Sequence, residues 1–110
     1  MTLEELLAAH TYPIAELARR LIDHVESAAE WSKTKVYPGW HGVGFHHADA
    51  GYVVAVFPRA TSVRVLFEQG RMLGDADYLE GFGQTRSIEF TEWDLDRLAV
   101  VDDLIDRALA

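Results

Sequence analysis

The sequence predicts an α+β fold, a two-layer α-β(4-5)-α sandwich in which helices from both ends of the chain cover an antiparallel sheet of four or five strands. Three observations support this prediction. Apolar residues recur at helical spacing near both termini, residues in the middle alternate with a period of two, and short turns separate the alternating runs. Short turns pair neighbouring strands as antiparallel hairpins, so a meander is expected. We expect the 110 residues to form one domain, 1–110.

Helices are predicted at the start of the chain. Residues 2–9 are expected to form a short helix, and a longer one begins near Thr11, a candidate cap, with Pro13 in its first turn. The longer helix has an apolar stripe at helical spacing, made of Ile14, Leu17, Ala18, Leu21, Ile22, Val25 and Ala29. This stripe is expected to pack against the sheet.

The middle of the chain is predicted to form strands, over residues 35–37, 40–46, 52–57, 62–67 and 85–90. Residues 69–84 contain four glycines and are expected to form an irregular loop, in which 78–80 make one helical turn. Thr91 and Asp94 then resemble a capping box at the start of a last helix. Its apolar stripe is Leu95, Leu98, Val101, Ile105, Ala108 and Leu109.

The charge of the chain argues against nucleic acid as a partner. The formal net charge is -8, and duplex binding draws its affinity from clusters of Lys and Arg. The N-terminus is acidic where a signal peptide is basic, and no apolar run approaches the length of a membrane span. Together with the absence of cysteine, these features lead us to expect a cytoplasmic protein without a membrane partner.

One stretch of the chain carries a resemblance to a known family. Residues 63–70 read VRVLFEQG, residues 73–75 read LGD, and residues 79–88 read LEGFGQTRSI. This stretch resembles the YdhG-like family of uncharacterised bacterial domains, and YPGWHGVGF at 37–45 looks like the first hairpin of that family. The resemblance implies a layout similar to frataxin. Because some members are described as frataxin-like iron chaperones, it also implies weak iron binding as an alternative function.

The predicted last helix carries a candidate metal site. Asp102, Asp103 and Asp106 lie near its C-terminus, where carboxylates oppose the helix dipole. Hard cations such as Fe²⁺ are bound by carboxylate oxygens, so weak metal binding is one interpretation. The preferred interpretation is a solvated face in which Asp103 pairs with Arg107.

A candidate ligand site lies on one face of the strand predicted over 40–46. Trp40, Gly42, Gly44 and His46 share its parity, and two glycines leave a trough that a helix, an aromatic side chain or a ligand must fill. Close helix packing or a bulge is the preferred interpretation. The functional alternative is a small-ligand pocket lined by Trp40, His46 and Tyr52.

Histidines are also concentrated in this region. Imidazoles at His41, His46 and His47 beside Asp49 are a ligand set that zinc and iron use. On an extended strand, however, His46 and His47 point to opposite faces. We therefore interpret them as strand-end histidines and not as a metal centre.

The glycine loop and the arginine after it form a third candidate. Gly81 and Gly83 lack the spacing of a dinucleotide or phosphate loop. Arg86 shares the parity of Ile88 and Phe90, so its guanidinium needs a carboxylate or carbonyl partner. The preferred interpretation is an arginine that ties the loop to the sheet, and the alternative is an arginine that binds an anion.

The sequence contains no recognisable catalytic motif. We expect a non-catalytic binding domain without a cofactor, which engages a small ligand or a protein through the Trp40, Tyr52 and Arg86 side and the glycine loop. The alternative is the iron-binding protein described above. An exposed Trp31 or Trp93, or a long edge strand, would support a homodimer.

Overall fold

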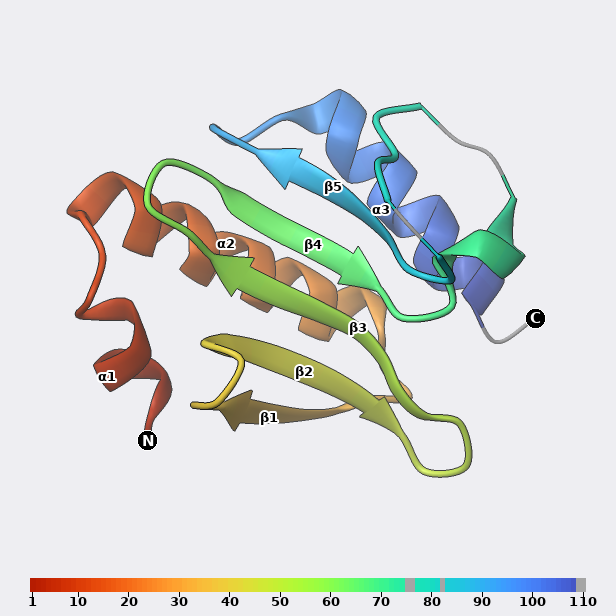
Figure 1. Cartoon of the computed structure of the whole chain (residues 1–110), viewed down its shortest axis with the longest axis horizontal. Coiled ribbons are helices and arrows are strands. Elements are labelled where there is room, and N and C mark those ends of the chain that lie inside the picture. Colours follow the sequence, from red (N-terminus) through yellow and green to blue (C-terminus); the bar gives the residue numbers. More distant parts are fainter. Residues whose placement is uncertain (75–76, 82, 109–110) are drawn as a thin grey trace.

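The computed structural model describes residues 1–74, 77–81 and 83–108 (Figure 1). In chain order its elements are α1 Leu3–Leu7, α2 Tyr12–Ala28, β1 Lys33–Tyr37, β2 Gly42–His47, β3 Gly51–Pro58, β4 Val63–Phe67, the short 3₁₀ helix η1 Gly70–Leu73, β5 Arg86–Phe90 and α3 Leu95–Ala108. The predicted α+β class with an antiparallel sheet is confirmed, and the sheet has five strands.

The five strands form a meander, because each is hydrogen-bonded to the next one along the chain and every pair is antiparallel. The register places one apolar row across the sheet, from Val43 to its partner Val56, then to Val65 and Ile88. The register between β2 and β3 shifts once, between Phe45 and His46. This bulge keeps His46 opposite Tyr52.

Helices α2 and α3 lie on the same face of the sheet (Figure 1). The predicted stripe of α2 is buried throughout, and it packs with the apolar residues that alternate along the strands. In α3 the buried residues are Leu98, Val101, Leu104 and Ile105, whereas Leu95 is exposed. Leu109 lies outside the described residues. The core therefore sits between the helices and one face of the sheet.

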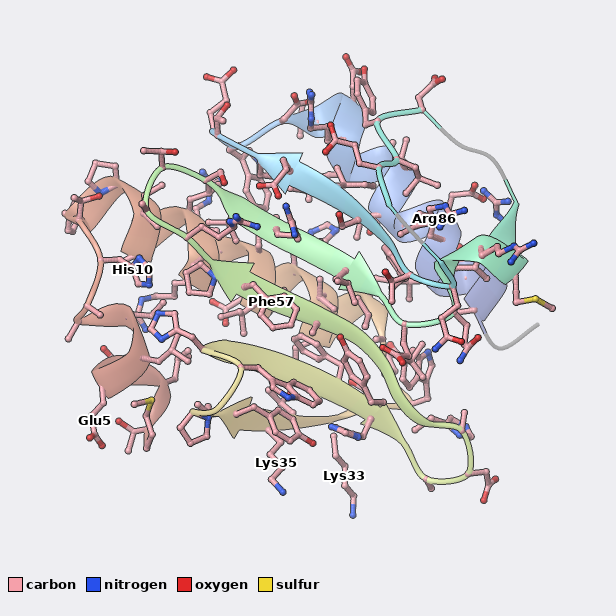
Figure 2. The ribbon with its side chains drawn as sticks, in the orientation of Figure 1. Glu5, His10, Lys33, Lys35, Phe57 and Arg86 are labelled. Atoms are coloured by element: carbon pink, nitrogen blue, oxygen red, sulfur yellow. The ribbon has the colours of Figure 1, made fainter. Side chains whose placement is uncertain are left out.

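The opposite face of the sheet, which we call the open face, has no helix over it in the described residues (Figure 1). Side chains that alternate with the core residues point to this side. Figure 2 shows Phe57, Lys33 and Lys35 on it, away from the helices. Because polar and aromatic groups alternate here with a buried apolar set, the sheet is two-sided in the manner typical of antiparallel sheets.

Two local predictions were wrong. The strand predicted from residue 40 begins at Gly42, and Trp40 and His41 lie in the turn after β1, where His41 has a left-handed φ of 53°. Residues 78–80 do not form a helical turn. Tyr78 has a φ of 66° and Glu80 pairs with Ser87 in an isolated bridge, so this part of the loop runs along the outer edge of β5.

The helix caps also differ from expectation. Thr11 occupies the cap position of α2, but its side chain makes no capping hydrogen bond, whereas Thr2 and Glu5 form a capping box at α1. At α3 the backbone N–H of Arg97 donates to the carboxylate of Asp94 at 3.0 Å. Asp94, and not Thr91, therefore caps α3.

Trp31 and Trp93, whose exposure would have supported a homodimer, are not exposed. Both side chains are partly buried and pack against the core, and Arg20 lies 3.9 Å from the centre of the Trp93 ring. Trp40 is the tryptophan that is half exposed, at 49%. Among the described residues, no helix combines the length and the apolar character needed to cross a membrane.

Candidate ligand-binding groove

The two glycines of β2 make room for aromatic rings on the open face. A Cβ atom on Gly42 would lie 2.4 Å from Cδ1 of Phe57, and one on Gly44 would lie 2.8 Å from Cε2 of Tyr37. Both distances are too short for a real side chain. The trough predicted along this strand is therefore filled by aromatic side chains from the neighbouring strands, and not by a helix.

Four rings lie together beside these glycines, and we call them the aromatic cluster: Tyr37, Trp40, His46 and Tyr52. Tyr37 and Trp40 are stacked with ring centres 4.3 Å apart, and the Trp40 and Tyr52 centres are 5.3 Å apart. His46 lies 5.8 Å from Tyr52, and its Nε2 forms a hydrogen bond with the Tyr37 hydroxyl. Offset and tilted pairs at these distances are favourable beyond the area they bury.

Two adjoining hollows lie next to the aromatic cluster. The Glu68 hollow has a volume of about 210 Å³ and is lined by Trp40, Tyr52, Phe57, Leu66, Glu68 and Thr85. The Arg64 hollow has a volume of about 320 Å³ and is lined by Trp40, His41, Phe57, Pro58, Arg59, Arg64 and Leu66. Because they share Trp40, Phe57 and Leu66, we treat them as one aromatic groove.

The two ends of the aromatic groove carry opposite charges. At one end the Glu68 carboxylate accepts a hydrogen bond of 3.2 Å from the Gln84 amide. Burial raises the pKa of Tyr52, and the negative charge of Glu68 raises it further. The phenol of Tyr52 therefore stays neutral beside the Glu68 side chain.

At the other end, Arg64 is balanced by Glu89. The Arg64 guanidinium donates to the Glu89 carboxylate, which also accepts a 2.7 Å hydrogen bond from the Ser62 hydroxyl. Burial by itself would raise the pKa of Glu89, but the hydrogen bonds from Ser62 and Arg64 outweigh it and the pKa is lowered. Arg59 lies 3.9 Å from the same carboxylate.

The three histidines that were considered as metal ligands, His41, His46 and His47, have separate partners. His41 meets His10 with Nε2 atoms 2.6 Å apart, His46 bonds Tyr37, and Nδ1 of His47 accepts the backbone N–H groups of Asp49 and Ala50. Among residues 1–74, 77–81 and 83–108, no group of three His, Cys, Asp or Glu side chains is placed to hold a metal ion. The contact between His10 and His41 joins segments far apart in sequence and follows no local pattern.

Acidification is expected to weaken this histidine contact. Burial lowers the pKa of His10 and the charge of His41 lowers it further, while the Arg59 carbonyl acts in the opposite direction. The unfolded chain then binds the proton more readily, so stability is complete above the ordinary pKa of about 6.5 and declines as the pH falls below it. NMR titration should place the His10 pKa below that value, and His10→Gln should make the free energy of unfolding less sensitive to acid. A His10 pKa at or above the ordinary value would contradict this expectation.

Arg86 and the glycine loop form a group of their own at the β5 edge of the sheet (Figure 2). Nη1 of Arg86 donates to the carbonyl oxygens of Gly83 at 2.9 Å and Thr85 at 2.6 Å. A Cβ atom on Gly81 would lie 2.3 Å from the Thr85 oxygen and 2.9 Å from Cδ of Arg86. These contacts are those expected of an arginine that ties the loop to the sheet. Arg86 lines neither hollow and adjoins the groove through Thr85.

The aspartates of α3 point to different partners. Asp102 Oδ1 lies 2.7 Å from Nε2 of His24, and Asp103 forms an ion pair with Arg107. Asp106 is exposed. The structure therefore does not direct the three carboxylates of the candidate iron site at one point.

The structure thus brings Trp40, His46 and Tyr52 together and leaves Arg86, Gly81 and Gly83 apart from them. Sequence reasoning missed Tyr37 and Phe57. The tight turn after β1 could have indicated Tyr37, because the chain reverses there and β2 then pairs with the strand that carries Tyr37. Neither a family model, nor a curated protein, nor a solved structure matches the chain. Function is therefore inferred from the residues of the groove.

Proposed function

We propose that the protein is a binding domain that takes a small organic molecule into the aromatic groove without transforming it. The observation that supports this proposal most directly is Trp40. Its side chain is 49% exposed although it stacks on Tyr37 and borders both hollows. A large ring held in place at the rim of a concave, mostly apolar surface is typical of ligand sites.

The groove is organised before any ligand arrives. Trp40 is held between the rings of Tyr37 and Tyr52, and Tyr37 is fixed by its hydrogen bond to His46. Ala55, opposite Gly44 and Leu66 on the same face, is fully buried. Because these groups are already ordered, binding loses little side-chain entropy.

The size of the hollows favours a small molecule over a protein partner. The volume of about 320 Å³ lies at the lower end of the range for ligand sites, roughly 300–1,000 Å³, and the volume of about 210 Å³ lies below it. Charged side chains stand at both ends, where they can orient a ligand. A flat protein interface would instead need a much larger contiguous surface.

Two finer assignments belong to the same proposal. The helix-sheet-helix order and the motifs of residues 63–88 support a YdhG-like, frataxin-like fold. Iron binding by Asp102, Asp103 and Asp106 is the alternative function. The hydrogen bond of Asp102 with His24 and the ion pair of Asp103 with Arg107 do not favour it.

A fragment screen observed on the ¹⁵N-labelled protein tests the proposal. We expect fragments with apolar rings or branched alkyl groups to shift the Trp40 indole N–H and the amides of Phe57 and Leu66. Trp40→Ala should weaken the binding of any such fragment at least about tenfold, since fully burying an aromatic side chain is worth roughly 1.5–3 kcal/mol.

Tyr12→Ala is the matched control, because Tyr12 is an exposed aromatic residue on α2 that lines neither hollow. It should leave fragment binding unchanged. The proposal fails if no fragment shifts the groove resonances, or if Trp40→Ala and Tyr12→Ala have equal effects.

A further inference from the structure

We propose that the ligand carries an organic cation, an alkylammonium or quaternary ammonium group, which sits in the Glu68 hollow. This inference rests on the proposed function and names the chemical class of the ligand. It is drawn from the side chains that line that hollow: three aromatic rings, Trp40, Tyr52 and Phe57, and one carboxylate, Glu68.

Aromatic rings attract cations through the negative potential above their faces. The aromatic cluster already shows this chemistry within the chain, because the ammonium of Lys35 lies 5.2 Å from the centre of the Tyr37 ring. Trp40 stacks on Tyr37 through one side, and half of its surface remains open to the solvent. A cation entering the Glu68 hollow therefore meets Trp40 in its lining, and tryptophan is the most favourable ring for this contact.

The carboxylate of Glu68 adds a full negative charge at the same place. The Glu68 carboxylate accepts a hydrogen bond from Gln84, a neutral partner. The charge of Glu68 also acts on Tyr52. Burial is the main cause that raises the pKa of Tyr52, and the Glu68 charge raises it further. The negative potential that discourages ionisation of the phenol favours a positively charged ligand group.

The cations of the groove lie at its other end. Arg59 and Arg64 line the Arg64 hollow and not the Glu68 hollow, and the single carboxylate of Glu89 offsets part of their charge. Lys35 lies over the Tyr37 ring, and neither Lys33 nor Lys35 lines the Glu68 hollow. The net charge of -8 further favours the approach of cations over anions.

The size of the hollow agrees with a compact head group. Its volume of about 210 Å³ is several times the roughly 30 Å³ that a water molecule occupies in the liquid. The lining is mostly apolar apart from Glu68 and Thr85, which suits methyl or methylene groups around a buried charge.

Three molecules of nearly the same shape test the inference. Choline carries the positive charge, 3,3-dimethyl-1-butanol replaces its quaternary nitrogen with carbon, and 3,3-dimethylbutanoate carries a negative charge. Each is titrated into the ¹⁵N-labelled full chain at constant ionic strength, with the Trp40 indole N–H and the groove amides as readouts. We expect choline to bind at least about fivefold more tightly than the alcohol, and the carboxylate to bind most weakly.

Glu68→Gln removes the charge and keeps the shape of the side chain. It should reduce choline affinity about fivefold and leave the affinity for the alcohol nearly unchanged. Glu16→Gln on the exposed side of α2 changes the net charge equally and serves as the control. It should have little effect on either molecule.

The possible failures are distinguishable. If the alcohol or the carboxylate binds as tightly as choline, or if Glu68→Gln weakens both choline and the alcohol equally, the cation inference is wrong while the groove remains a binding site. If none of the three molecules shifts the groove resonances, the cation inference is also wrong. The fragment screen then decides whether the groove binds small molecules at all.

Discussion

Phe45→Ala is expected to lower the free energy of unfolding by about 3–5 kcal/mol, the largest effect that we predict for a single substitution. Phe45 is fully buried on the helix-covered face of β2, opposite Val54. Truncation removes its buried apolar surface and leaves a cavity that the sheet and α2 can fill only in part. Urea unfolding followed by far-UV circular dichroism measures the change.

Phe57→Ala is the matched comparison, because it makes the same chemical change on the open face of the neighbouring strand. Phe57 is partly exposed and covers Gly42, so its loss should destabilise the protein clearly less than the loss of Phe45. It should also enlarge the aromatic groove, because Phe57 lines both hollows. Equal losses of stability in the two variants would contradict the division into a core face and an open face.

Gly81→Ala is expected to destabilise the protein by about 1–3 kcal/mol, through overpacking. The added Cβ would lie 2.3 Å from the Thr85 carbonyl oxygen and 3.0 Å from the Arg86 Cα. Both atoms belong to the backbone, so relief requires the loop to move away from β5. Such a movement would also disturb the bridge between Glu80 and Ser87.

Gly39→Ala is the control for this prediction, since a Cβ at Gly39 meets nothing within 4 Å. Its midpoint of thermal unfolding should stay close to that of the unchanged protein. A Gly81→Ala protein as stable as Gly39→Ala would show that the loop does not pack closely on Arg86.

The helices and strands were predictable because each has a periodic pattern that its own residues carry. The stripe of α2 repeats at helical spacing over its whole length, and β4 alternates between buried and half-buried residues. The turn predicted at 78–80 failed for a different reason. Glu80 pairs with Ser87, and a bridge between two residues separated by six others leaves no periodic signal in the sequence.

The candidate site was predictable in part. The pairing of β2 with β3 places Tyr52 beside His46, as short turns between neighbouring strands predict. Trp40 joins them from the turn before β2, so the alternation along the strand does not set its position. The alternation of side chains along a strand does not determine which face of the sheet the helices leave open, because that depends on packing between elements distant in the sequence. The contact between His10 and His41 joins residues 31 apart in the sequence, and no local spacing encodes it.

The strand at one border of the sheet has a consequence for the behaviour of the protein at high concentration. The only two lysines of the chain, Lys33 and Lys35, both lie on β1, which has a neighbour on one side. An unpaired strand invites a second chain to extend the sheet, and charged side chains on it oppose that association. At the opposite border, the Glu80 bridge occupies part of β5. Replacement of both lysines by threonine should therefore promote aggregation without a comparable loss in the free energy of unfolding.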